Sequence, residues 1–350
     1  MRDEATGPGH HMASELAEQP RIWRGLVQRH AEFHAIGRAI AARSPRFVLL
    51  AARGTSDHAA LYAKYLVEIL HGLPAGLVSP STMTAYGAAP DLRDVMLIAV
   101  SQSGGSPDLV QTVEIARRGG ALTLAVTNSP ASALAAAAEL NVDVMAGAEK
   151  SVVATKSYTA QLLALYLVLE HWRGGDASEA HAIADLGDTV LNQAQLAILA
   201  SAPRYRFAQR MLVTGRGYAY PTAREAALKL METSYVSAQA FSGADLLHGP
   251  LALLDPLVPV LAIIPQGVAG AAMAQVVPRV SQARADLFIV GTREAVAQAD
   301  AGFALPGGDA EVMSPLLEIL PFQILALHVA VERGEDPDTP RGLRKITKTT

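Results

Sequence analysis

The feature that most constrains this fold is an alternation of uniformly apolar segments with longer helical patterns. Apolar runs without polar alternation are typical of strands in parallel sheets that helices cover on both faces. We predict strands at 47–52, 94–100, 121–126, 142–145, 208–214, 259–264 and 286–291. We predict helices at 57–71, 107–118, 157–172, 186–202 and 223–240, after an N-terminal helical segment at 14–44. The chain is therefore expected to be an α/β protein.

The same order of features occurs twice. Strand 47–52 leads into Gly54 and a helix, and strand 208–214 leads into Gly215 and another helix, 161 residues later. This offset is close to the length of one domain, roughly 100–200 residues. We therefore predict two α/β domains of similar topology that arose by duplication. The predicted bounds are 1–45 for a leader and helical segment, 46–198 and 199–335 for the two domains, and 336–350 for a C-terminal tail.

Composition excludes several classes of protein. Half of the 350 residues are hydrophobic and 18% are charged, so a large core is available and global disorder is excluded. The absence of cysteine rules out disulfides, thiolate metal sites and a cysteine nucleophile. A net charge of −4 argues against a nucleic-acid partner. An anionic substrate stays possible, because a local site can be positive within an acidic whole.

Targeting and membrane signals are also missing. We find no uninterrupted apolar run of ~20 residues, so no membrane-spanning helix is expected. Residues 1–11 lack the apolar region of a signal peptide and are interpreted as a disordered leader or a non-native extension before Met12. A soluble cytoplasmic protein is the expectation.

A serine- and glycine-rich turn follows the predicted strand 94–100. It reads Ser101-Gln102-Ser103-Gly104-Gly105-Ser106 and leads into Pro107 and a helix. In open parallel sheets, ligands bind beyond the carboxyl ends of the strands. Ser106 suits the N-cap position and Pro107 the first helical position. Hydroxyl groups and free backbone N–H groups at a positive helix end form a ready anion site.

Two further loops offer similar groups. They are Gly54-Thr55-Ser56 after the first strand and Thr155-Lys156-Ser157 before the helix at 157. Serine and glycine are ordinary turn residues, and for any single loop a purely structural role is the favoured interpretation. Three such loops in one domain favour phosphate binding. The sequence contains neither Gly-x-x-x-x-Gly-Lys-Ser/Thr nor Gly-x-Gly-x-x-Gly, the two glycine motifs that bind nucleotides. Neutral hydroxyl donors suit a small phosphomonoester better than a triphosphate with Mg²⁺.

A charged stripe lies on the otherwise apolar helical segment 223–234. Glu225, Lys229 and Glu232 follow one another at spacings that place them on one helix face. They form either a stabilising pair on a solvated stripe with Glu232 as a spectator, or part of a site. Downstream, His248 precedes Gly-Pro, and a lone histidine in such a place more often makes a structural hydrogen bond than acts as a catalyst. Lys345 lies in a basic terminus. A carboxylate, an imidazole and a lysine together would suit proton transfer and imine chemistry.

Taken together, these segments resemble the sugar isomerase (SIS) family. The similarity covers nearly the whole chain from Glu18 to Lys345. The matching motifs are GTS at 54–56, SQSGGSPD at 101–108, VVATKSYTAQ at 152–161, GRGYAYPTAREAALKLMETSY at 215–235, DLLHGPLALLD at 245–255 and HVAVERGEDPDTPRGLRK at 328–345. The resemblance implies two tandem SIS-type domains, each a parallel-sheet, three-layer αβα sandwich of flavodoxin-like topology.

The resemblance also implies roles for single residues. Glu232 matches the base that moves a proton between C1 and C2 of the sugar, and His248 matches a ring-opening acid/base contributed across a homodimer interface. Lys345 matches a tail lysine that holds the open-chain sugar, and Glu225 and Lys229 match neighbours that tune these groups. The matching phosphate cradle comprises Ser56, Ser101, Gln102, Ser103 and Ser106.

The implied activity is amino-sugar phosphate chemistry. The most similar members are the isomerase half of glucosamine-6-phosphate synthase and the SIS-type glucosamine-6-phosphate deaminases. The synthase uses a cysteine nucleophile in a glutaminase domain, and this chain has neither, so we expect no glutamine-dependent synthesis. We predict a glucosamine-6-phosphate deaminase that needs no metal or redox cofactor. The alternatives are a deglycase or isomerase acting on another phosphorylated amino sugar or sugar–amine adduct, and a non-catalytic sugar-phosphate sensor.

Overall fold

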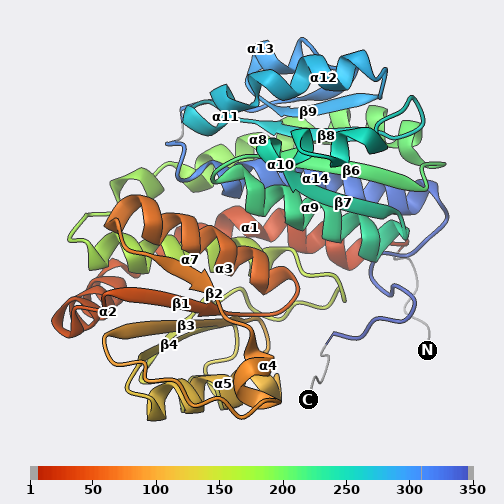
Figure 1. Ribbon diagram of the computed structural model, residues 1–350. Coiled ribbons are helices and arrows are strands. Elements are labelled where there is room, and N and C mark those ends of the chain that lie inside the picture. Colours follow the sequence, from red (N-terminus) through yellow and green to blue (C-terminus); the bar gives the residue numbers. More distant parts are fainter. Residues whose placement is uncertain (1–6, 309, 346–350) are drawn as a thin grey trace, which may run out of the picture. The chain divides into compact units, whose positions relative to one another are not determined.

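The computed structural model describes residues 7–308 and 310–345, which group into two compact units (Figure 1). The first unit comprises 21–149, 156–181 and 344–345 of the described residues. The second unit comprises 7–20, 150–155, 182–308 and 310–343. Each unit is built around one parallel sheet of five strands in the part of the chain that is described.

The sheet of the first unit has the strand order β2-β1-β3-β4-β5, with every pair parallel. Its strands are β1 (Phe47–Ala51), β2 (Ala75–Leu77), β3 (Val95–Ser101), β4 (Leu122–Thr127) and β5 (Leu140–Asp143). Its helices are α2 (His30–Arg43), α3 (Thr55–Leu66), α4 (Pro80–Thr84), α5 (Pro107–Arg118), α6 (Ala133–Ala137) and α7 (Lys156–Trp172).

Helices cover both faces of this first sheet. Figure 1 shows α3 and α7 on one face and α5 on the other. Successive residues of β3 are buried because each face has its own helical cover: Leu97 and Ala99 pack into a cluster with Leu109 and Val113 of α5. The strand register sets Ala51 beside Ala99, so the carboxyl ends of β1 and β3 share one edge. Loops that follow these strands are thereby brought together.

The sheet of the second unit repeats this order as β7-β6-β8-β9-β10, again with parallel pairs. Its strands are β6 (Arg210–Gly215), β7 (Ser237–Ser242), β8 (Val260–Ile264), β9 (Leu287–Gly291) and β10 (Ala301–Ala304). Its helices are α8 (Ile183–Ser201), α9 (Ala219–Ser234), α10 (Gly243–Leu247), α11 (Val268–Ala272), α12 (Val276–Gln282), α13 (Arg293–Val296) and α14 (Ser314–Glu332). The predicted pair of parallel αβα sandwiches is confirmed.

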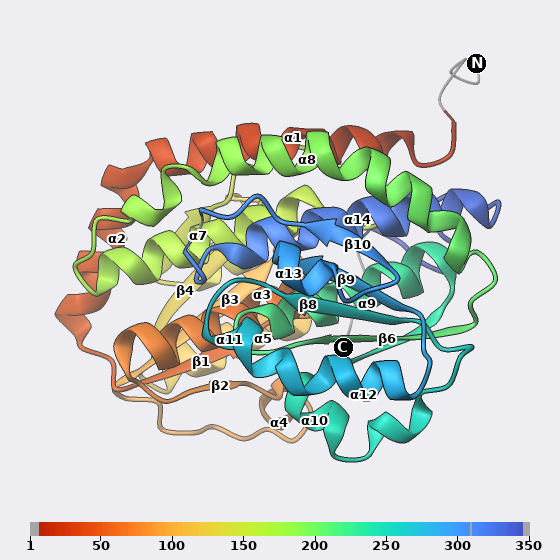
Figure 2. The ribbon, with the colours of Figure 1, turned by 90° about the horizontal axis from the view of Figure 1, so that it is seen from above.

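The helix α14 is the apolar centre of the second unit. It is long and apolar enough to span a membrane, but its most apolar stretch is 89% buried inside the protein. Figures 1 and 2 show it beside α9 on one side of the sheet, with α12 on the other. In the described part of the chain, this candidate membrane span is therefore a core helix.

The predicted helix at 223–240 is wrong in its last third, at residues 235–240. Helix α9 ends at Ser234, because Tyr235 adopts a left-handed conformation with φ 55°. The chain then forms the edge strand β7, which was missed, as were the short strands β2 and β10. The end of α9 matters because it places Glu232 in the last turn of the helix, beside Tyr235.

The predicted disordered leader is also wrong for residues 7–11. Helix α1 (His10–Gln28) begins at His10, and α2 follows it where one helical segment at 14–44 was expected. The backbone N–H groups of His11 and Met12 donate to the carboxylate of Asp338, at 2.8 Å each. A carboxylate at the positive end of a helix satisfies amides that lack a partner within the helix. Residues 1–6 lie outside the described part of the chain.

Candidate functional site

The turn between β3 and α5 is held by hydrogen bonds to its own serine hydroxyls. Gly104 has φ +61°, and the hydroxyl of Ser101 accepts a hydrogen bond from its N–H at 3.1 Å. The hydroxyl of Ser103 accepts from the N–H of Gly105 at 3.3 Å. A serine hydroxyl that accepts one hydrogen bond keeps its own proton to donate. Both hydroxyls can therefore donate to a ligand oxygen.

The end of this turn leads into α5 as predicted. Ser106 occupies the N-cap position with an extended backbone, Pro107 is the first helical residue, and the Ser106 side chain makes no capping hydrogen bond. The amides of the first helical turn have no partner within the helix, and the helix dipole is positive here. Gln102 is half-buried in the same turn, where its carbonyl oxygen accepts from Asn128.

The β1–α3 loop meets the same edge of the first sheet. Gly54 has φ +56°, Thr55 begins α3, and Ser56 is buried in its first turn. The third predicted loop is divided between the units. Lys156 begins α7 in the first unit and Thr155 belongs to the second, and both side chains are buried. Gly54 and Ser56 therefore lie at the same sheet edge as the serine turn.

Sequence reasoning missed an arginine at this edge. The guanidinium of Arg53 lies 2.7 Å from the Oδ2 atom of Asp108, whose side chain is 4% exposed in the first turn of α5. The pair links the β1–α3 loop to the helix that follows the serine turn. Its signal in the sequence was a cation directly before Gly54. The turn is therefore not served by neutral donors alone.

The charged stripe on α9 is buried rather than solvated. The Nζ atom of Lys229 lies 3.2 Å from Glu225 Oε1 and 2.6 Å from Glu232 Oε2. Lys229 and Glu225 are fully buried, whereas the side chain of Glu232 is 22% exposed. Lys229 also donates to the carbonyl oxygen of Ala154 at 3.2 Å. Of the two interpretations, the solvated stripe is wrong, and Glu232 is the member that reaches solvent.

The electrostatics of this triad favour a fixed cation. Burial by itself lowers the pKa of Lys229, but the carboxylates of Glu225 and Glu232 outweigh it and raise the pKa well above its usual value. Lys229 is therefore held as an ammonium that forms an ion pair with Glu232. A carboxylate that is held by a buried cation and still reaches solvent has a fixed orientation toward an incoming substrate.

The two other predicted catalytic residues occupy separate elements. His248 is exposed at the C-terminal end of α10, where its N–H donates to the carbonyl oxygen of Asp245. Lys345 belongs to the first unit, and its Nζ atom lies 2.8 Å from Oε2 of the buried Glu149. Their catalytic roles stay predictions.

Comparison with known proteins assigns the fold to a family. The family model of the SIS domain matches residues 43–171 and 205–333. The chain belongs to the SIS domain family. The first match includes β1 to β5 and the second includes β6 to β10, so each SIS domain corresponds to one parallel sheet.

Relatives of these two SIS domains are named for phosphorylated sugars. The chain is 34% identical to glutamine–fructose-6-phosphate aminotransferase (isomerizing) of Gloeobacter violaceus over 98% of this chain and 59% of the relative. It thus spans a little over half of that relative's length. A solved structure from Silicibacter pomeroyi, assigned as a phosphosugar isomerase, is 30% identical with a TM-score of 0.82 and covers 94% of this chain and 99% of that one.

A third comparison concerns the fold alone. Glucosamine-6-phosphate deaminase from Thermotoga maritima has a TM-score of 0.76 and 19% identity, over 97% of this chain and 100% of that one. The fold of this chain is therefore similar to the fold of that deaminase over almost the whole length of both chains.

In the second SIS domain, the turn equivalent to 101–106 is contacted by a carboxylate of the chain itself. The turn after β8 leads into the short α11, and the carboxylate of Glu311 accepts from the N–H groups of Val268 at 3.0 Å and Ala269 at 2.7 Å. A carboxylate of the chain itself thus occupies the position at which the first SIS domain presents its serine turn.

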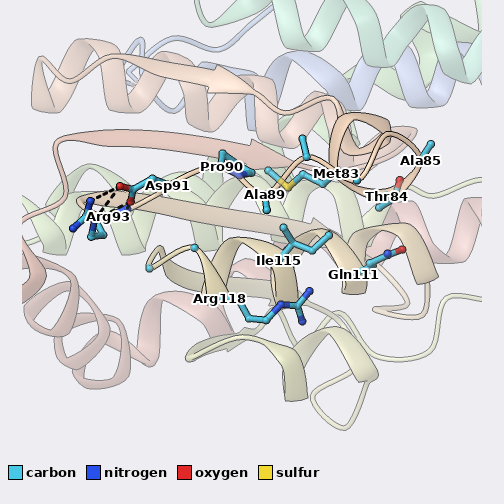
Figure 3. A pocket seen from close by; sticks show the side chains of 14 residues that line it. Met83, Thr84, Ala85, Ala89, Pro90, Asp91, Arg93, Gln111, Ile115 and Arg118 are labelled. Carbon is cyan, nitrogen blue, oxygen red and sulfur yellow. Dashed lines mark hydrogen bonds and ion pairs between the residues drawn. The ribbon is translucent and has the colours of Figure 1, made fainter.

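A hollow of about 740 Å³ in the first unit lies away from the serine turn. Figure 3 shows Gln111, Ile115 and Arg118 of α5 on one side of it and residues of α4 on the other. It reaches Gly119 and Gly120 beyond the C-terminal end of α5, whereas the serine turn precedes its N-terminal end. None of the predicted site residues lines this hollow, so it is not the predicted phosphate site.

Proposed function

We propose that this chain is a glucosamine-6-phosphate deaminase. It would convert glucosamine 6-phosphate and water into fructose 6-phosphate and ammonia. The observation that carries the proposal is the triad on α9, in which buried Lys229 holds Glu232 at 2.6 Å while Glu232 keeps access to solvent. The names of the relatives supply the substrate class, a six-carbon sugar phosphate that carries or receives nitrogen.

The serine turn supplies the phosphate-binding part of the proposal. Ser101 and Ser103 have hydroxyl protons available, and the amides of the first turn of α5 add donors at a positive helix end. Arg53, next to Gly54, adds a cation at the same edge of the first sheet. A phosphomonoester accepts hydrogen bonds from all of these donor types.

The proposed chemistry is a proton transfer followed by hydrolysis. After ring opening, Glu232 takes the proton from C2 of the open-chain amino sugar and returns it to C1. The C1 oxygen takes up a proton and the amine nitrogen releases one, so that the aldehyde carbon becomes a hydroxymethyl group and C2 becomes an imine that carries the nitrogen. Water then adds to C2, and ammonia leaves to give the ketose. Positioned acid–base groups contribute about 10²- to 10⁴-fold to such steps.

His248 is proposed as the group that opens the ring, donated from the partner of a homodimer. Its exposure on the surface of its own SIS domain supports this role. Mixing an H248N variant with an E232Q variant tests it, because heterodimers would then contain one complete site. Recovery of activity on mixing is expected. A mixture that exchanges subunits and stays inactive would contradict the shared site.

Lys345 is proposed to bind the open-chain sugar. The reaction as written needs no metal or redox cofactor, and this expectation stays a prediction. We also retain the predicted cytoplasmic location, which a fractionation experiment would check.

The decisive experiment measures both products. Purified protein is incubated with glucosamine 6-phosphate, and equal amounts of ammonia and fructose 6-phosphate are expected, with E232Q as the inactive control. A parallel arm supplies fructose 6-phosphate with glutamine, where no product is expected because the 350 residues contain no cysteine. A panel of other phosphorylated amino sugars and sugar–amine adducts is tested alongside. Turnover of a panel member alone would favour a deglycase or isomerase, and binding without any turnover would favour a sensor.

A further inference from the structure

Glu149 is a buried carboxylate that the predicted site did not include. Its side chain has no exposed surface, and its Oε1 atom accepts from the N–H of Ser157 at 3.1 Å. Its Oε2 atom accepts from the hydroxyl of Ser157 at 2.8 Å and from the ammonium of Lys345 at 2.8 Å. All three residues belong to the first unit.

The bonds from Ser157 fix the carboxylate in place. Ser157 is the second residue of α7, so its N–H is one of those that find no partner within the helix. Glu149 satisfies this amide and places its charge at the positive end of a seventeen-residue helix that is buried along almost its whole length. The carboxylate is therefore oriented by the fold, independently of Lys345.

The tail residue Lys345 depends on that carboxylate. Its side chain is 25% exposed, so it reaches Glu149 from the surface. Upstream, the N–H of Arg341 donates to the hydroxyl of Tyr235 at 2.8 Å, and its guanidinium lies 3.9 Å from the centre of the Tyr235 ring. Within the second unit, the start of the tail is therefore held at Arg341.

We propose that Glu149 is a positioning residue that sets where the Lys345 ammonium sits and keeps it there during turnover. The kinetic part of this inference rests on the proposed function. A buried charge that loses its partner is strongly disfavoured, so the two groups hold each other. An ammonium has three N–H donors, so Lys345 can bind a sugar oxygen while it keeps its contact with Glu149. The lysine is thereby presented as a cation at a fixed point.

The first test detects the Glu149–Lys345 contact and does not depend on turnover. Lysine acylation by a water-soluble amine reagent is followed by mass spectrometry at Lys345 in the wild type and in E149Q. A hydrogen bond between charged groups contributes about 10- to 100-fold, so the Lys345 acylation rate is expected to rise by about tenfold or more in E149Q. Lys64, which pairs with Glu68 elsewhere in the first unit, serves as an internal reference.

The matched control is S157A. This variant removes the hydroxyl that Glu149 accepts from but leaves the Glu149–Lys345 pair intact, so Lys345 acylation is expected to stay near the wild-type rate. E149D retains the charge and is expected to restore part of the protection that E149Q loses. Equal acylation of Lys345 in the wild type and a folded E149Q would overturn the inference.

A double-variant comparison tests the kinetic part. If Glu149 acts through Lys345, E149Q lowers kcat in the wild-type background but has little further effect in K345A. Effects that multiply in the double variant would show that Glu149 acts independently and would contradict the inference. If the wild type does not turn over glucosamine 6-phosphate, the proposed function fails, and the acylation experiment still decides the positioning role.

Discussion

Lys229 lies 2.6 Å from Glu232, and of these two residues only Glu232 reaches solvent. The lysine is thus a buried support, and in the proposed reaction the glutamate is the reactive group. This division of roles predicts opposite consequences for substitutions that are only three positions apart on one helix.

Replacing the glutamate should remove activity and leave the fold intact. E232Q keeps the size of the side chain but cannot act as a base, so turnover of glucosamine 6-phosphate is expected to fall by about 10²- to 10⁴-fold. Calorimetric titration with fructose 6-phosphate should show binding close to that of the wild type. A variant that turns over substrate normally would remove Glu232 from the mechanism.

Replacing the lysine should instead destabilise the protein. K229M leaves Glu225 buried without its cation, which is expected to lower the free energy of unfolding by about 3–5 kcal/mol. Urea denaturation followed by circular dichroism measures this change. K64M is the matched control, because the Lys64–Glu68 pair is partly exposed and is expected to contribute about 1 kcal/mol or less. Equal losses in the two variants would contradict the role of the buried triad.

Adjacent glycines in the serine turn should respond differently to alanine. At Gly104 a Cβ atom would lie 2.1 Å from the hydroxyl of Ser132, and φ is +61°, so G104A is expected to distort the turn and weaken binding of fructose 6-phosphate at least tenfold, a change of about 1.4 kcal/mol. At Gly105 the nearest recorded neighbour of a Cβ atom is the Ser103 hydroxyl at 3.7 Å. G105A is therefore the control, with little expected change. Similar affinities for both variants would argue against the serine turn as the phosphate site.

Stability should fall in mild acid because of buried His171. Burial, followed by the neighbouring charge of His30, lowers the pKa of His171 below its usual 6.5. The unfolded chain therefore binds a proton that the folded chain resists, so stability is fully present above about pH 6.5 and is lost as the pH falls below it.

Thermal unfolding measured between pH 5 and pH 8 tests whether stability falls as the pH falls. Burial lowers the pKa of His71 and of His328 as well, so the H171Q variant should lose part of the acid dependence and not all of it. The readout is the difference in midpoint between the two pH values, since lost packing affects both. An unchanged difference in H171Q would exclude His171 as a contributor.

Local signals explain which parts of the fold could be predicted. Helix α5 was predicted with its observed bounds, because Ser106 and Pro107 mark its start and Gly119 its end. The end of α9 was not, because Tyr235 adopts the left-handed conformation without being a glycine. A turn that is stabilised by its surroundings carries no signal in its own residue type.

The candidate site shows the same division. The spacing of Glu225, Lys229 and Glu232 placed them on one helix face, but their burial depends on the rest of the second unit and could not be read from the spacing. Glu149 lies 196 residues from Lys345, and no local pattern joins residues so far apart. Contacts of this kind appear only when the chain is folded.

If the serine turn of the first SIS domain binds phosphate as proposed, the carboxylate of Glu311 at the start of α11 sets the expected binding stoichiometry. Both domains inherit the same strand order, but one of the two equivalent turns is already neutralised by the chain itself. A titration should therefore saturate at one phosphosugar molecule per polypeptide. In the proposed function, the second SIS domain contributes the helix with Glu232 instead, so that each of the two domains has a task that the other lacks.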